Sequence, residues 1–252
     1  MDELEGWQDL LESAARLLGL RAWRIELALA REGELAQGVL AESVVEDPAE
    51  RRAKILLRPG LAPDTHGQVI WHELMHIVIS PCANTWPAAF VLEEIQVGHF
   101  ERALQAVIEG YRFPVLDNIE QVVAEARDFT GLAINDWRIH IEPTDGPTFA
   151  FSEYYRNGIG WGAFAARSIT LQLNSRAGPG EIVRELFRVV LNPYGRPDRA
   201  QWQDNVLEKV MPALDGLGLW ELWHRAGRRV WGERGCGGTN GRKPCSECRR
   251  CH

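Results

Sequence analysis

Two stretches of the chain are variants of one sequence, and this constrains the fold more than any other feature. Residues 70–81 read Ile-Trp-His-Glu-Leu-Met-His-Ile-Val-Ile-Ser-Pro, and residues 182–193 read Ile-Val-Arg-Glu-Leu-Phe-Arg-Val-Val-Leu-Asn-Pro. The glutamate, the leucine, the apolar triplet and the proline persist, whereas both histidines become arginine. Two shorter matches flank this one: residues 23–27 with 137–141, and residues 91–95 with 206–210. The sequence therefore predicts a tandem duplication.

Each copy predicts the same series of elements. An amphipathic helix pattern ends at a glycine in both copies, Gly19 and Gly131. Strand-like runs follow at residues 23–30, 36–44 and 54–57 in the first copy, and at 137–142, 147–155 and 168–173 in the second. The predicted fold is α+β, with two tandem units at residues 1–112 and 113–216. Each unit has an N-terminal helix, a small twisted sheet, a motif helix and one further helix, and residues 217–252 follow as a tail.

The first copy carries an HExxH motif inside an apolar run. His72 and His76 are four residues apart, so on a helix they lie on one face and can bind one Zn²⁺. Glu73 can reach a metal-bound water as general base. The alternative is a core helix with two hydrogen-bonded histidines, which does not explain a glutamate in an apolar run. In the second copy, Arg184 and Arg188 offer no lone pair to a metal, so this copy is predicted to be degenerate.

A catalytic zinc needs a third protein ligand, and residues 87–109 are predicted to form the helix that supplies it. The candidates are Glu93, Glu94 and His99. In the alignment Glu93 persists as Glu208, whereas Glu94 becomes Lys209. Loss of a ligand should accompany loss of the histidines, so the alignment favours Glu94. Arg184 and Arg188 are expected to pair with Glu185 or Glu208.

The tail combines a tryptophan-rich helix pattern at residues 217–231 with a Cys-rich end. Leu219, Trp220 and Trp223 lie near one face of that helix, which is expected to dock on the core. Four thiolates suit one tetrahedral structural zinc, and they belong to Cys236, Cys245, Cys248 and Cys251. The alternative is a Cys-rich tail without a metal. Its lysine and arginines are also compatible with binding to a phosphate backbone.

Composition bounds the remaining possibilities. The chain has 252 residues, 45% hydrophobic and 25% charged, as in ordinary globular proteins. No apolar run approaches the roughly 20 residues that span a bilayer. The N-terminus is acidic and lacks the basic start of a signal peptide, so a cytoplasmic location without membrane contact is expected.

The sequence from His72 to His76, followed by Glu94 on a later helix, resembles the zincin metallopeptidases, and within them the gluzincins. Residues 94–104 also resemble the ligand helix of ImmA/IrrE-type and other small phage- or prophage-borne metallopeptidases. The resemblance covers about residues 1–110 and implies a zincin-like first unit; the second unit is expected to be zincin-like through the duplication, although the sequence departs from the family there and in the Cys-rich tail. It further implies that a sheet-edge strand, here residues 54–58, binds an extended peptide by strand addition. Tyr111 is a candidate stabiliser of the transition state.

The function implied by this resemblance is zinc-dependent hydrolysis of peptide bonds in a peptide or protein substrate. Glu73 would take a proton from the metal-activated water and deliver it to the leaving amine. A protease unit followed by a Cys cluster also resembles the SprT-like proteases, in which His99 would have to be the third ligand. Two other functions remain open: an inactive zincin-like scaffold that binds partners, and a nucleic-acid-associated factor that acts through the basic tail.

Overall fold

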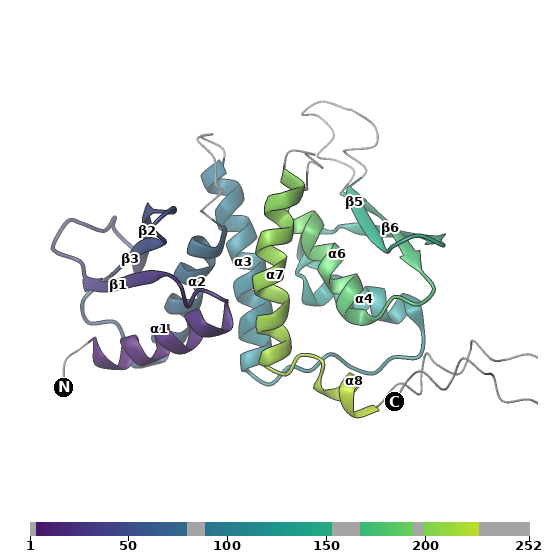
Figure 1. The fold of residues 1–252 in the computed structure, drawn as a ribbon, viewed down its shortest axis with the longest axis horizontal. Coiled ribbons are helices and arrows are strands. Elements are labelled where there is room, and N and C mark those ends of the chain that lie inside the picture. Colours follow the sequence, from purple (N-terminus) through teal and green to yellow (C-terminus); the bar gives the residue numbers. More distant parts are fainter. Residues whose placement is uncertain (1–3, 80–88, 153–166, 194–198, 227–252) are drawn as a thin grey trace, which may run out of the picture.

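The computed structural model describes residues 4–79, 89–152, 167–193 and 199–226. Helices and strands are both abundant in these ranges, which confirms an α+β fold (Figure 1). The four cysteines of the tail lie outside the described residues. Within the described residues, no helix is both long enough and apolar enough to cross a bilayer.

The first half is a helix, a three-stranded sheet and two further helices. Its elements are α1 (Glu5–Leu17), β1 (Arg24–Leu29), β2 (Ala41–Asp47), β3 (Arg52–Leu57), α2 (His66–Ile79) and α3 (Ala89–Ile108). The strand order is β1-β3-β2, with β1 parallel and β2 antiparallel to β3. One face of α1 is buried through Trp7, Leu11 and Ala14, in keeping with its amphipathic pattern.

The second half repeats this order and topology. Its elements are α4 (Ile119–Phe129), β4 (Arg138–Thr144), β5 (Phe149–Ser152), β6 (Ser168–Asn174), α6 (Pro179–Leu191) and α7 (Ala200–Gly216), followed by the short α8 (Glu221–Ala226). The strand order is β4-β6-β5, again with one parallel and one antiparallel pair. The expected docking of the segment after α7 is observed, because Leu219 and Trp220 are buried and the Trp223 indole donates to the Pro114 carbonyl at 2.7 Å.

Two details of the predicted sheet are wrong. The strand at residues 54–58, expected at an edge, belongs to β3, which is the central strand, and the edges are β1 and β2. The second strand begins at Ala41 rather than at residue 36. Residues 36–40 instead form a turn that Arg58 holds, because its guanidinium donates to the carbonyls of Val39 and Ala36, each at 2.7 Å. The Arg58 side chain, just after β3, thus holds this turn, while the Arg58 backbone amide donates to the Leu40 carbonyl at 2.8 Å.

The alignment of the last helix of each copy is also wrong. Residues 94–104 of α3 and 204–214 of α7 show the same order of buried, half-buried and exposed side chains. This register places Asp204, rather than Lys209, at the position of Glu94. Glu208 is exposed and does not correspond to Glu93. The sequence match at residues 91–95 was misleading because an apolar pair followed by a charged residue recurs at several registers of an amphipathic helix.

The two halves pack through the helices that follow the motif helices, and α3 and α7 lie side by side at the centre of the molecule (Figure 1). The Gln96 side chain donates to the Leu191 carbonyl at 2.6 Å, and the Trp202 indole donates to the Ile79 carbonyl at 3.1 Å. The rings of Phe100 and Phe187 stack across the boundary, with centroids 4.6 Å apart. The helix that carries Glu94 is therefore fixed from both halves.

Removal of the Phe100 ring should weaken the whole chain. Phe100 is fully buried, so Phe100→Ala leaves a cavity on both sides of the boundary and should lower the free energy of unfolding by about 3–5 kcal/mol. Urea denaturation measures this change. Phe149→Ala, at a ring that is 45% exposed, is the matched control and should change stability by less than about 1 kcal/mol. Equal effects of the two substitutions would contradict this packing.

Candidate metal centre

Helix α2 holds its two histidines on a half-buried face and buries almost everything else. The buried residues around them include Val69, Ile70, Leu74, Met75, Ile77, Val78 and Ile79. A helix packed on so many apolar side chains has little freedom to rotate or shift, since each displacement would expose apolar surface. The apolar run that the sequence shows therefore fixes the direction in which His72 and His76 project.

Three side chains converge on one point. The Nε2 atoms of His72 and His76 are 3.2 Å apart. The Glu94 carboxylate reaches from α3 to within 3.3 Å of the His76 Nε2 and 3.7 Å of the His72 Nε2. These three residues form a cluster that could hold a metal ion. Two ligands about 2.0–2.1 Å from a tetrahedral ion lie roughly 3.3–3.4 Å apart, so the spacing fits one ion.

The other ring nitrogens show why an ion suits this cluster. The His72 Nδ1 is 2.9 Å from a Glu101 oxygen, and the His76 Nδ1 is 2.9 Å from a Glu93 oxygen. A carboxylate is an acceptor, so each Nδ1 carries a proton, and the Nε2 lone pair of a neutral imidazole is then available to a metal ion. A cation between the two lone pairs removes their repulsion.

These contacts shift the pKa values of His72 and Glu101. The hydrogen bond to Glu101 raises the pKa of His72, against the lowering effect of burial. Burial by itself would raise the pKa of the Glu101 carboxyl, but hydrogen bonds from His72 and Gln68 lower it. Glu101 is therefore held ionised, which is the state that accepts the His72 Nδ1 proton in a hydrogen bond.

The structure separates the three candidates for the third ligand. Glu94 lies with the two Nε2 atoms, whereas Glu93 lies behind His76 and orients its ring. His99 is not part of the cluster. Its Nδ1 is 2.8 Å from the Thr130 carbonyl of the second half, and burial lowers the pKa of its ring. Glu101 was not predicted. Its position two helical turns after Glu93 and Glu94, on the same face of α3, is the signal that could have found it.

Glu73 lies beside the cluster, in the lining of the same cavity as His72 and His76. It is 5% exposed and accepts hydrogen bonds from the side chain and the backbone of Ser43 on β2. Burial raises the pKa of its carboxyl, and Ser43 and the two histidines oppose that rise. Glu73 therefore connects the motif helix to an edge strand.

A groove of about 880 Å³ opens above the cluster. One wall is β2 with the turn before it, and the other is formed by α2 and α3. Its lining consists of Ala36, Val39, Leu40, Ala41, Glu42, Ser43, Val45, Gln68, Val69, His72, Glu73, His76, Glu93, Glu94 and Glu101. The candidate metal site is thus accessible to an extended ligand that runs along an edge strand.

The corresponding place in the second half contains an ion-pair network. Arg188 contacts Glu185 at 3.1 Å and Asp204 at 2.7 Å, and Arg184 lies 3.5 Å from Asp204. Asp204, and not the expected Glu208, therefore completes the network. Glu185 accepts from the Ala150 amide of β5 at 3.4 Å, just as Glu73 accepts from Ser43 of β2. The two guanidinium groups place positive charge between the carboxylates of Glu185 and Asp204.

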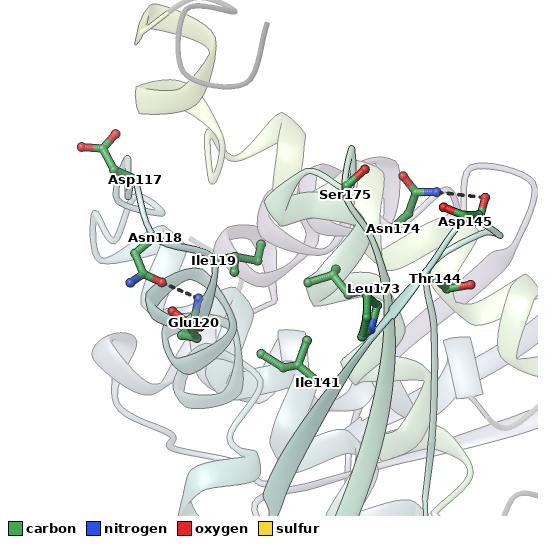
Figure 2. A pocket seen from close by; sticks show the side chains of 11 residues that line it. Asp117, Asn118, Ile119, Glu120, Ile141, Thr144, Asp145, Leu173, Asn174 and Ser175 are labelled. Carbon is green, nitrogen blue, oxygen red and sulfur yellow. Dashed lines mark hydrogen bonds between the residues drawn. The ribbon is translucent and has the colours of Figure 1, made fainter. Parts of the chain in front are cut away.

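Two other features lie away from this centre. A second cavity of about 870 Å³, between the start of α4 and the ends of β4 and β6, has no histidine, cysteine, lysine or arginine in its lining (Figure 2). Tyr111, a candidate transition-state stabiliser in the sequence, donates its hydroxyl to Glu125 of α4 at 2.5 Å. It follows the C-terminus of α3, about 20 Å along the helix from Glu94, so this prediction is wrong.

The predicted second metal site is not part of the structure described. Cys236, Cys245, Cys248 and Cys251 lie outside the described residues, as does most of the basic segment proposed to contact nucleic acid. Both remain predictions. No family model, curated protein or solved structure matches this chain.

The contact between Glu101 and His72 predicts a loss of metal affinity without loss of a ligand. Glu101→Gln should weaken binding at the α2–α3 site about 10–100-fold, because the His72 Nδ1–H loses its charged partner and the neutral amide that replaces it holds the tautomer less firmly. Competition with a chromogenic chelator measures this affinity. Glu109→Gln, an exposed residue just after the same helix, is the control and should leave it unchanged. Equal affinities for the two variants would show that Glu101 does not orient His72.

The revised register predicts that a second site can be restored. In Arg184→His/Arg188→His, two imidazoles would face Asp204 across the place where the guanidinium groups now lie. Native mass spectrometry should find one more bound ion per chain than in the wild type. The further change Asp204→Asn should remove the added ion. Absence of any gain would contradict the equivalence of Asp204 and Glu94.

Proposed function

We propose that this chain is a zinc-dependent metallopeptidase built from two zincin-like units, of which only the first holds a catalytic metal. The observation that carries the proposal is the convergence of His72, His76 and Glu94 beside a buried glutamate on an open groove. A structural metal site needs neither the groove nor the glutamate. Metal-assisted hydrolysis needs both.

Zinc is the ion that the donor set favours. Two neutral imidazoles and one carboxylate are three protein ligands of the kind found in catalytic zinc sites, which keep a further position open. The carboxylates behind both histidines are the usual outer partners of such ligands. When bound, the ion would act as a Lewis acid toward a carbonyl and lower the pKa of a water.

Residues of the chain would transfer the proton and bind the substrate. Glu73 would accept a proton from the attacking water and return it to the leaving amine, and its low exposure protects that exchange from bulk solvent. β2 is an edge strand of the described sheet, and apart from the Ser43 amide, which donates to Glu73, its outer side offers backbone amide and carbonyl groups along the groove wall. An extended substrate could therefore add to the sheet as a further strand. The sequence analysis expected β3 to bind the peptide, but β3 is the central strand, so we assign peptide binding to β2.

Substitutions at Glu73 and at His72 distinguish a catalytic role of this chain from a scaffold role. With zinc-loaded wild type, we expect cleavage of an unfolded protein substrate, measured by peptide release. Glu73→Gln should lower the rate about 10²–10⁴-fold while keeping the metal, because the base is lost and the ligands are not. His72→Ala should lose the metal and the activity together.

The control is Glu181→Gln, at an exposed glutamate on the corresponding helix of the second half, which should change neither property. A metal-loaded wild type that cleaves no substrate would overturn the proposal and favour an inactive scaffold that binds partners. The persistence of the second half without histidines is the observation that makes a scaffold the second candidate.

A further inference from the structure

The groove above the metal centre carries charge of one sign. Its lining contains five glutamates, Glu42, Glu73, Glu93, Glu94 and Glu101, and no lysine or arginine. Four of them serve the centre, as base, ligand or partner of a histidine. Glu42 does not, since it is an exposed residue of β2 next to Ser43.

A bound metal does not cancel this charge. Five carboxylates less the two charges of a divalent ion leave three negative charges in the lining, because ligating histidines are neutral. Residues 80–92, which connect α2 to α3 and include the first turn of α3, contain no charged side chain in the sequence. They therefore cannot offset the carboxylates. A cleft lined by one sign of charge concentrates ligands of the other sign.

The second half shows that this charge is not imposed by the fold. At the corresponding place two arginines face Glu185 and Asp204, so the network is neutral. The surplus of negative charge is particular to the half with the histidines, where it adjoins an open groove.

Apolar side chains stand at one end of the same groove. Val39 and Leu40 are 36% and 44% exposed although they are large and hydrophobic. Arg58 fixes the turn that carries them through the carbonyls of Val39 and Ala36. A bound polypeptide with both apolar and cationic side chains could contact these fixed apolar residues and the negatively charged lining at the same time.

We propose that the groove selects polypeptide segments rich in lysine and arginine. This inference rests on the proposed function for the identity of the reaction, but the selection itself is a property of binding. Glu42 contributes to it without taking part in metal binding or proton transfer. Acidic segments are disfavoured by repulsion from the same carboxylates.

The experiment compares three fluorogenic peptides that share one uncharged core and carry two flanking Lys, Gln or Glu residues. On zinc-loaded full-length protein, kcat/KM should be about tenfold higher for the Lys peptide than for the Glu peptide at low salt, and the ratio should shrink at high salt. Glu42→Gln should lower the ratio severalfold. Glu46→Gln, on the same strand but outside the groove lining, should leave it unchanged.

Binding of the same peptides to Glu73→Gln, followed by fluorescence anisotropy, separates the two proposals. If no peptide is cleaved but the Lys peptide binds tightest, the metallopeptidase proposal fails and the selection stands. If the three peptides are cleaved or bound equally, or the Glu peptide is preferred, the selection is overturned. A Lys preference that is the same in Glu42→Gln and Glu46→Gln overturns the role of Glu42.

Discussion

The arrangement of the first half depends on two imidazole rings whose Nε2 atoms face each other at 3.2 Å. Such a contact between neutral rings is unfavourable unless a cation lies between them. Glu101 and Glu93 hold the opposite nitrogens of the two rings, and Glu94 adds a negative charge at the meeting point, so the side chains together favour a cation there. All three glutamates come from α3, so the packing of α3 against α2 determines whether the site exists.

Helix α3 also forms the boundary between the halves. Its other face carries Gln96 and Phe100, which bind the second half through a hydrogen bond and a ring stack. The second half therefore supports the helix that carries Glu94. Ion pairs between Arg188 of α6 and Asp204 of α7 link these two helices, and both helices contact α3.

Much of the fold and the centre of the site could be read from the sequence. The HExxH spacing and the apolar run predicted that His72 and His76 share one face of α2, and the copy comparison favoured Glu94 over Glu93 as their partner. The register that paired Glu94 with Lys209 is nevertheless not the one observed. A helical amphipathic pattern fits several registers, and only tertiary contact with the motif helix selects one.

Other features were not accessible to sequence reasoning. Glu101 belongs to the site only because α3 packs against α2 so that its fourth turn lies at His72. The edge position of β2 depends on strand order, which local patterns do not encode. Tyr111 was singled out by proximity in the chain, yet the helix carries it away from the metal centre.

The metallopeptidase proposal depends on a metal ion held by His72 and His76 of the first half. Native mass spectrometry of the full-length protein beside His72→Ala/His76→Ala tests this dependence most directly. The double variant should keep its fold but bind one zinc fewer per chain than the wild type. Equal zinc content in the two proteins would mean that the converging side chains do not hold zinc, and the metallopeptidase assignment would fall with them.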